Sequence, residues 1–391
     1  MGGALTVGDV LILFSVVVTS VAAALTRGGR MPTSVAVEGS AIALLMLVVF
    51  GTLSAIGSSD PAASMEFVTR IVVIAIALPW VARWVLVEPA HLERALRWLL
   101  LGSAFSASGT LLQVALGGGA IAGSQVGTDG RLSGWTGHVS DLGGIAAMGV
   151  AIGIGFLLKG GKWLPIHTAL LALSAVGLIL SGSVSGMIAS FAAAGFYLVR
   201  GHIRVRGFVV AGLLGVAALA ITSTLQSATD ALNPWERLLR TLGLTDGGAY
   251  STSESRADTF AAAIPQIIQS PIVGHGFDGV SGSPDGLFPA HNILIGAAFQ
   301  GGLIFCAALS YLLVRNFRGG WMRVNRDLMS SQVAATAFAA LVFAMTAPSL
   351  FNRYLWLPVA ILGAAKAIAI NRETQDRRTD RFSAGAAVVR T

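Results

Sequence analysis

Charged residues are scarce in this chain of 391 residues. Asp, Glu, Lys and Arg together make up 12% of it, about half of their share of roughly 25% in ordinary soluble domains. Hydrophobic residues reach 54%, and their runs are longer than the core of a soluble protein requires. This combination excludes a disordered chain and a water-soluble enzyme, and it is typical of a polytopic membrane protein.

Cysteine is nearly absent as well. Cys306 is the single cysteine of the sequence, so neither an intrachain disulfide nor a metal cluster held by several thiolates can form. The sequence also lacks a Gly-rich phosphate loop that ends in Gly-Lys-Ser or Gly-Lys-Thr, and ATP hydrolysis is therefore not expected.

Eleven apolar runs are each close to the roughly 20 residues that cross a bilayer as a helix. We therefore predict an all-α polytopic membrane protein with about 11 transmembrane helices, in which residues 1–370 form a single bundle. The break between the sixth and seventh helices falls at Ser181–Gly182–Ser183. The predicted spans are 10–26, 35–57, 67–88, 95–116, 140–158, 163–181, 184–199, 207–225, 290–314, 330–347 and 350–370.

The basic residues predict how the bundle is oriented. With the N-terminus outside and the C-terminus inside, 20 of the 26 Lys and Arg residues fall on the cytoplasmic side, as expected because these residues resist translocation. The net charge of +7 then reflects this asymmetry and does not indicate a nucleic-acid partner. Six arginines are predicted on the outer side: Arg70, Arg131, Arg237, Arg240, Arg256 and Arg353.

Residues 226–289 are predicted to form a long extracytoplasmic loop that contains short helices. Ser251–Glu254 fits a capping box, and apolar residues then recur at helical spacing as far as Ile268. Such a helix could lie on the bundle and direct Arg256 toward its mouth, or it could expose Arg256 to solvent. At the other end of the chain, the polar residues 371–391 are predicted to form a disordered cytoplasmic tail whose basic residues contact anionic lipid.

Other polar residues lie at the outer ends of predicted spans. Pro289 suits a first helical turn, which places His291 and Asn292 at the start of the ninth span. A neutral histidine there could take a proton from a sugar hydroxyl, or it could be a satisfied interfacial histidine. Arg353 is either a ligand contact or an anchor to lipid headgroups. The Gly-rich segment 117–140, which carries Arg131, could equally be a flexible surface loop.

Several short motifs in this order resemble the O-antigen ligase/polymerase family. One dominant outer loop precedes a late helix, and the loop contains Pro271-Ile-Val-Gly-His-Gly276. His291-Asn292 and Gly301-Gly-Leu-Ile304 follow. Earlier in the chain, Arg131-Leu-Ser-Gly-Trp-Thr-Gly137 and Ser181-Gly-Ser-Val-Ser-Gly186 are similar to the family's loop before a middle span and to its Ser-rich turn.

The resemblance implies a glycosyltransferase of the bacterial plasma (inner) membrane with its active site facing outside. Such an enzyme passes a glycan from undecaprenyl pyrophosphate to a hydroxyl of a glycan, lipid or protein acceptor, without a metal or another cofactor. The resemblance assigns His291 as the base and Arg256 as the residue that holds the pyrophosphate. Arg131, Arg70, Asn292 and Arg353 are the further candidates for substrate binding.

The sequence departs from the family at one position. The Ser-rich turn of the family carries an arginine where this chain has Val184, so one expected contact with pyrophosphate is missing. Arg131 or Arg70 could supply the missing charge from a neighbouring outer position.

Two other classes of protein are weighed against this interpretation. A transporter or flippase of lipid-linked or polar substrates usually places ionisable residues at the middle of the bilayer and contains repeats, neither of which is evident in the sequence. A metal-dependent hydrolase could use His275, Asp278, Asp285 and His291, but their spacing matches no dense ligand motif.

Overall fold

The computed structural model describes residues 7–25, 37–121, 124, 130–206, 252–284, 290–323, 327–347 and 350–388. Within these ranges the regular structure is helical and contains no strand. The helices are α1 (Val7–Leu25), α2 (Val37–Ile56), α3 (Pro61–Val72), the π-helix η1 (Val73–Ala77), α4 (Leu78–Val85), α5 (Pro89–Ala115), α6 (Val139–Lys159), α7 (Leu164–Leu180), α8 (Val184–Val199), α11 (Thr252–Gln269), α12 (Ile293–Arg323), α13 (Leu328–Ala344) and α14 (Arg353–Val388).

The prediction of an all-helical membrane protein is confirmed. In the described part of the chain, five helical stretches are long and apolar enough to cross a bilayer: Pro61–Val85, Pro89–Ala115, Val139–Lys159, Ile293–Arg318 and Arg353–Ile370. Four shorter apolar helices accompany them, within α2, α7, α8 and α13. The predicted span at 207–225 lies outside the described residues, so the number of eleven spans and their orientation stay predictions.

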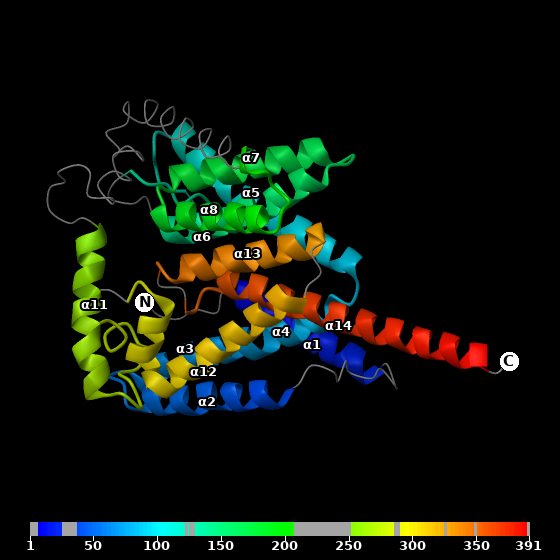
Figure 1. Ribbon diagram of the computed structural model, residues 1–391. Coiled ribbons are helices and arrows are strands. Elements are labelled where there is room, and N and C mark those ends of the chain that lie inside the picture. The colour runs from blue at the N-terminus through cyan, green and yellow to red at the C-terminus, as the bar shows by residue number, and fades with distance from the viewer. Residues whose placement is uncertain are drawn as a thin grey trace.

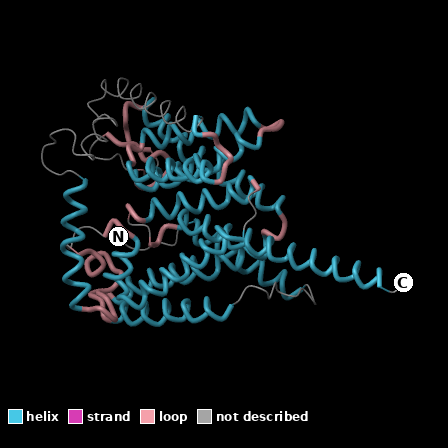
Figure 2. Tube along the Cα trace, in the orientation of Figure 1, coloured by secondary structure: helices cyan, strands magenta, loops and turns pink. Residues whose placement is uncertain are grey.

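The helices of the bundle run roughly side by side, and α11 lies across their ends (Figure 1). We call this end of the bundle the α11 end. Figure 2 shows that the short loops between α2 and α3 and between α13 and α14 also lie at this end. The starts of α6 and α8 lie there as well, because hydrogen bonds join them to the segment between α13 and α14. Polar residues from distant parts of the sequence therefore meet at the α11 end.

Helix α6 is the centre of the packing, since α5, α7, α8 and α13 all contact it. Its glycines make this possible. A Cβ atom at Gly149 would collide with the side chains of Ser103 and Ser174, and one at Gly155 would collide with Gln332. Small residues let helix backbones approach closely, which replaces the hydrophobic effect that lipid cannot supply.

Helix α14 extends beyond the predicted last span. It continues as a helix to Val388, and Figure 1 shows its final turns projecting from the end opposite α11. Composition favoured disorder for residues 371–391, whereas the structure is helical as far as it describes this segment. The segment contains Arg, Glu, Gln and Ala, which favour helix, and no proline, so it can prolong a helix that has already been nucleated.

The packing of α6 predicts a specific loss of stability in Gly149→Val. The added side chain would displace Ser103, whose hydroxyl donates to the carbonyl of Ile145 at 3.1 Å and contacts the Ser174 hydroxyl at 3.1 Å. Overpacking of this kind costs about 1–3 kcal/mol, which should appear as a lower melting temperature of the protein in detergent. The control is Gly195→Val, because a Cβ atom at Gly195 meets nothing within 4 Å. Equal losses in the two variants would contradict the assignment of close packing to Gly149.

Candidate functional site

Arg131 lies against the turn between α7 and α8. Its Nε donates a hydrogen bond to the carbonyl of Ser181 at 2.8 Å. The backbone of the next residue is attached as well, since the N–H of Leu132 donates to the carbonyl of Leu180 at 3.1 Å. An ideal Cβ at Gly182 would lie 3.5 Å from both Cγ and Nε of Arg131. The guanidinium is therefore held beside the turn in which the sequence lacks the family arginine.

The turn itself is built by its small residues. Gly182 adopts a φ of +58°, in the left-handed region that glycine tolerates best. Ser183 is the N-cap of α8, and its side chain accepts a hydrogen bond from the N–H of Gly186 at 3.2 Å. Val184 is the first residue of the helix. The predicted break at residues 181–183 is thus confirmed, and Arg131 lies at the N-terminal end of α8.

The loop that carries Arg131 is docked on α5. The N–H of Gly134 donates to Oε1 of Gln113 at 2.8 Å, and the N–H of Trp135 donates to the carbonyl of Ser106 at 3.2 Å. Gln113 is fully buried. These contacts show that residues 130–138 are not a free surface loop, because their backbone is hydrogen-bonded to a neighbouring helix.

Asn292 caps α12. Its Oδ1 accepts hydrogen bonds from the N–H groups of Leu294 at 2.9 Å and Ile295 at 3.1 Å, and its Nδ2 donates to the carbonyl of Met345 at 3.0 Å. His291 precedes this cap and is half-buried. The helix begins later than the predicted start at residue 290, because the Asn292 side chain caps it and α12 starts at Ile293. His291 therefore precedes the helix, and Pro289 lies outside the described residues. The side chain of Asn292 is engaged in holding the backbone beside His291.

Helix α12 is broken at Gly302, which has φ 82° and ψ 172°. The Sγ of Cys306 lies 3.3 Å from the carbonyl oxygen of Leu294. Twelve residues of straight helix would span about 18 Å, so the segment 293–301 must turn back toward the segment that follows Gly302.

The loop 271–276 is bonded to this break. The N–H of Leu303 donates to the carbonyl of Pro271 at 2.7 Å, and the N–H groups of His275 and Gly276 donate to the carbonyls of Phe299 and Gln300, each at 3.0 Å. A Cβ atom at Gly302 or Gly274 would collide with the opposing backbone. Two of the motifs that carry the family resemblance, 271–276 and 301–304, therefore contact each other directly.

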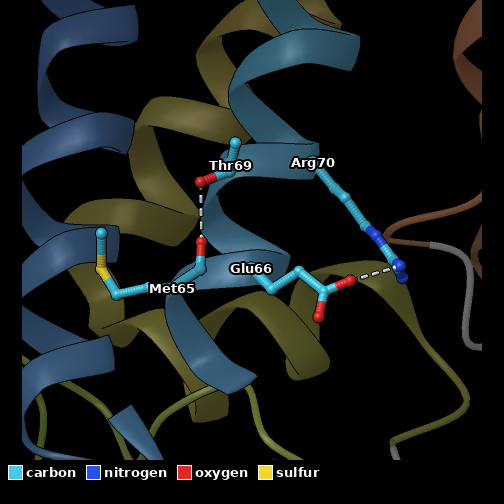
Figure 3. Close-up of polar contacts among 4 residues, drawn as sticks. All are labelled: Met65, Glu66, Thr69 and Arg70. Atoms are coloured by element: carbon cyan, nitrogen blue, oxygen red, sulfur yellow. Dashed lines mark hydrogen bonds and ion pairs between the residues drawn. The ribbon is translucent and has the colours of Figure 1, made fainter. Parts of the chain in front are cut away.

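Arg70 is engaged within its own helix. Its guanidinium forms an ion pair with Glu66 at 2.5 Å, one turn earlier on α3 (Figure 3). The same group lies 5.5 Å from the centre of the Phe67 ring, and Phe67 packs on Phe351 with ring centres 4.7 Å apart. Arg70 thus carries its own counter-ion, which weakens it as the replacement for the missing arginine.

Arg353 begins α14 beside a polar cluster that sequence reasoning did not assemble. The hydroxyl of Tyr354 donates to the Asp141 carboxylate at 2.9 Å, and Nδ2 of Asn352 approaches the Tyr354 hydroxyl at 2.6 Å and the same carboxylate at 3.4 Å. None of these three polar residues belongs to a motif that the sequence shows. The partners are more than two hundred residues apart, so no local pattern could reveal them.

Arg256 belongs to the first turns of α11, and its side chain lies outside the described residues. The helix predicted from the capping box is confirmed, since α11 begins at Thr252. The predicted apolar face, however, is not the packed one. Thr259 and Ala263 are buried, while Ile264 and Ile268 are 54% and 73% exposed. A membrane protein can expose apolar side chains to lipid, so hydrophobic periodicity alone does not identify the packed face.

Hydrogen bonds join these segments into one polar layer at the α11 end. The hydroxyl of Ser185, in the first turn of α8, donates to the carbonyl of Thr346 at 3.1 Å, next to the Met345 carbonyl that binds Asn292. The turn that holds Arg131 and the segment that contains His291 are therefore attached to two adjacent residues after α13.

An apolar groove of about 370 Å³ runs from this layer along the bundle. Leu294 and Met345 form the part next to Asn292, and α12 and α13 form its walls. The other lining residues are Ser310, Leu313, Val314, Phe317, Arg318 and Leu341.

Within the described ranges, no group of three or more His, Cys, Asp and Glu side chains is arranged to hold a metal ion. His275 has a different partner, since its Nε2 lies 2.9 Å from the carbonyl oxygen of Gln266 and its ring stacks on Phe299 at 4.8 Å. Both contacts attach α11 and the loop 271–276 to each other and to α12.

Asp278 fastens the same loop to the turn between α2 and α3. Its carboxylate accepts from the Ser59 hydroxyl at 3.0 Å and from the N–H groups of Val280 and Ser281 at 3.0 and 2.9 Å. Burial by itself raises the pKa of the carboxyl, but the hydrogen bonds from Ser281, Val280 and Ser59 outweigh burial and hold the pKa well below its ordinary value.

The family comparison supports the resemblance. Residues 169–310 match the family described as O-antigen ligase. No curated protein matches the chain. The matched range includes the α7–α8 turn, α11, the loop 271–276 and the first part of α12, which are the segments that meet at the α11 end.

The Asp278 contacts predict a pH-dependent stability. A carboxyl whose pKa is lower in the folded than in the unfolded protein stabilises the fold above the unfolded pKa of about 4 and loses this effect as the pH falls through the folded pKa. We expect Asp278→Asn to lower stability by about 1–3 kcal/mol at pH 7, and the difference from wild type to shrink below about pH 4. Melting temperatures in detergent between pH 7 and pH 3 measure this.

Asp60→Asn is the matched control, because Asp60 is an exposed N-cap that accepts from the Ala63 N–H at 3.0 Å and asparagine caps equally well. A gap between wild type and Asp278→Asn that stays constant down to pH 3 would contradict the assignment.

Proposed function

We propose, on the premise that residues 169–310 match the O-antigen ligase family, that the protein transfers a glycan from undecaprenyl pyrophosphate to an acceptor hydroxyl at the outer face of the bacterial plasma membrane. Glycan transfer of the O-antigen ligase type, by a membrane glycosyltransferase, follows from the family in general. The donor, the orientation, the independence from metal and the roles of individual residues are the proposal.

The observation that carries the proposal is the position of Arg131. Its side chain is held on the carbonyl of Ser181 and lies over Gly182, in the turn where the family's arginine is replaced by Val184. We therefore assign to Arg131 the contact with pyrophosphate that the family arginine would make. The N-terminal end of α8 adds to the effect, because N–H groups and the helix dipole at such an end favour an anion.

Arginine suits this role for a chemical reason. Departure of a lipid pyrophosphate builds negative charge, so a cation beside it stabilises the transition state more than the ground state. The guanidinium binds two phosphate oxygens at once and stays protonated. Arg256 is proposed as the second phosphate ligand, from α11. Arg70 is the weaker candidate because Glu66 already neutralises its charge. Arg353 begins α14 in the polar layer, and we propose that it contacts the glycan.

His291 is proposed as the base that takes the proton of the acceptor hydroxyl. The cap formed by Asn292 holds the backbone beside His291 to the carbonyl of Met345, after the end of α13, so the backbone that carries the imidazole is fixed in position. Asn292 was expected to bind substrate; its two hydrogen-bonding groups are engaged with α12 and Met345, and we assign it a positioning role.

The lipid tail of the donor has a suitable place as well. The groove between α12 and α13 is lined almost entirely by apolar residues and begins at Leu294 and Met345, beside the polar layer. A polyprenyl chain in this groove would leave the pyrophosphate at the level of His291 and Arg131.

The role of Arg131 is tested by comparing Arg131→Gln with Arg70→Gln. Loss of a charged partner of a phosphate typically costs about 2–4 kcal/mol of transition-state stabilisation, which is a fall in rate of roughly 30- to 900-fold. We expect this loss for Arg131→Gln and a much smaller one for Arg70→Gln. Rates are measured with a purified polyprenyl-pyrophosphate glycan and a hydroxyl acceptor. The opposite order would assign the missing charge to Arg70.

The base is tested by His291→Ala. Because a general base contributes roughly 10²–10⁴-fold to such a transfer, the variant should lose most of its activity while it still inserts into the membrane and binds the donor. Mass spectrometry of the products measures the transfer. Asn292→Asp, which preserves the cap, should keep more activity than His291→Ala. Full activity of His291→Ala would remove the base assignment, and transport of the donor without a covalent product would favour a flippase.

A further inference from the structure

A second group of cations lies at the end of the bundle opposite α11. Arg83 is in the last turn of α4, at the end of the candidate span Pro61–Val85. Arg315 lies near the end of the span Ile293–Arg318, and Lys366 near the end of the span Arg353–Ile370. Arg315 and Lys366 are each 13 residues, about 20 Å of helix, beyond Gly302 and Arg353 at the α11 end. The three cations therefore lie at a similar depth, far from the candidate active site.

The contacts around Gly363 bring these helices together. An ideal Cβ at Gly363 on α14 would lie 3.8 Å from a terminal guanidinium nitrogen of Arg83 and 3.9 Å from Oδ1 of Asn316 on α12. Arg315 precedes Asn316, and Lys366 follows Gly363 by one turn on the same side of α14. Helix α14 packs against both α4 and α12, so Arg83 occupies the space between three helices.

The Nε of Arg83 is a buried donor with no hydrogen-bond partner. Arg83 forms no ion pair with an acidic residue in the part of the chain that the structure describes, and Glu88, the nearest acidic residue along the chain, is exposed. A half-buried guanidinium beside a second arginine, without an acid, is unfavourable in a medium of low dielectric constant. An unsatisfied buried donor of this kind indicates that an acceptor is supplied from outside the chain.

We propose that Arg83 and Arg315, with Asn316 and Lys366, bind the phosphate of an anionic phospholipid headgroup at this end of the bundle. A guanidinium and an ammonium suit phosphate oxygens, and basic pockets between transmembrane helices bind anionic headgroups. The cations lie in the last turns of membrane spans, where a lipid places its phosphate while its acyl chains stay in hydrocarbon. The ligand is therefore a lipid and not a soluble anion.

Native mass spectrometry of the full-length protein tests this. The protein is released from lipid discs that contain equal amounts of phosphatidylglycerol and phosphatidylcholine, and the retained lipids are counted. We expect wild type to retain phosphatidylglycerol preferentially, and Arg83→Met and Arg315→Gln each to weaken this retention about fivefold. The matched control is Arg94→Gln, which removes an exposed arginine from α5 near the same end and should retain phosphatidylglycerol as wild type does.

A second measurement covers the case in which Arg83→Met does not fold. Phosphatidylglycerol added to wild type in zwitterionic detergent should raise its melting temperature, whereas Arg315→Gln should respond little. The proposal is overturned if Arg315→Gln and wild type respond equally, if Arg94→Gln loses the lipid as Arg315→Gln does, or if inorganic phosphate alone gives the full rise, which would indicate a site for a free anion.

Discussion

The backbone bonds between the loop 271–276 and the broken helix α12 are the constraint on which the candidate site depends. A helix that breaks at Gly302 exposes N–H and C=O groups that lipid cannot satisfy. Pro271, His275 and Gly276 supply the missing partners. Because the break is stabilised, the segment 293–301 can turn back toward Cys306, and His291 comes to lie beside the end of α13.

Charge pairing separates arginines that look equivalent along the chain. Arg70 forms an ion pair with Glu66 one turn away, whereas the hydrogen bond that fixes the position of Arg131 is to the backbone carbonyl of Ser181. A carbonyl positions a guanidinium but does not neutralise it. In the proposed site, Arg131 supplies from the preceding loop the charge that is absent at Val184.

The cations at the two ends of the bundle have different surroundings. At the α11 end, loops and helix starts surround a polar layer in which a reacting pyrophosphate could be bound and released. At the opposite end, Arg83 lies close to Gly363 of α14, which is also near Asn316 of α12, and we propose a lasting contact with lipid there. Both arrangements rest on the same physical effect, since a cation at the boundary between lipid and water attracts an anion.

Composition and short-range pattern determined the class of this protein: an all-helical membrane bundle, the break at residues 181–183 and the helix that begins at Thr252. Each of these follows from the hydrophobicity or turn chemistry of a few neighbouring residues. The tertiary structure alone decided that Arg131 contacts the α7–α8 turn, that Tyr354 and Asn352 hold Asp141, and that α11 packs through Thr259 and Ala263 instead of its isoleucines. These contacts join residues that are distant in the chain. In a membrane, moreover, an apolar side chain is as stable against lipid as against protein, so hydrophobicity could not indicate which face would be packed.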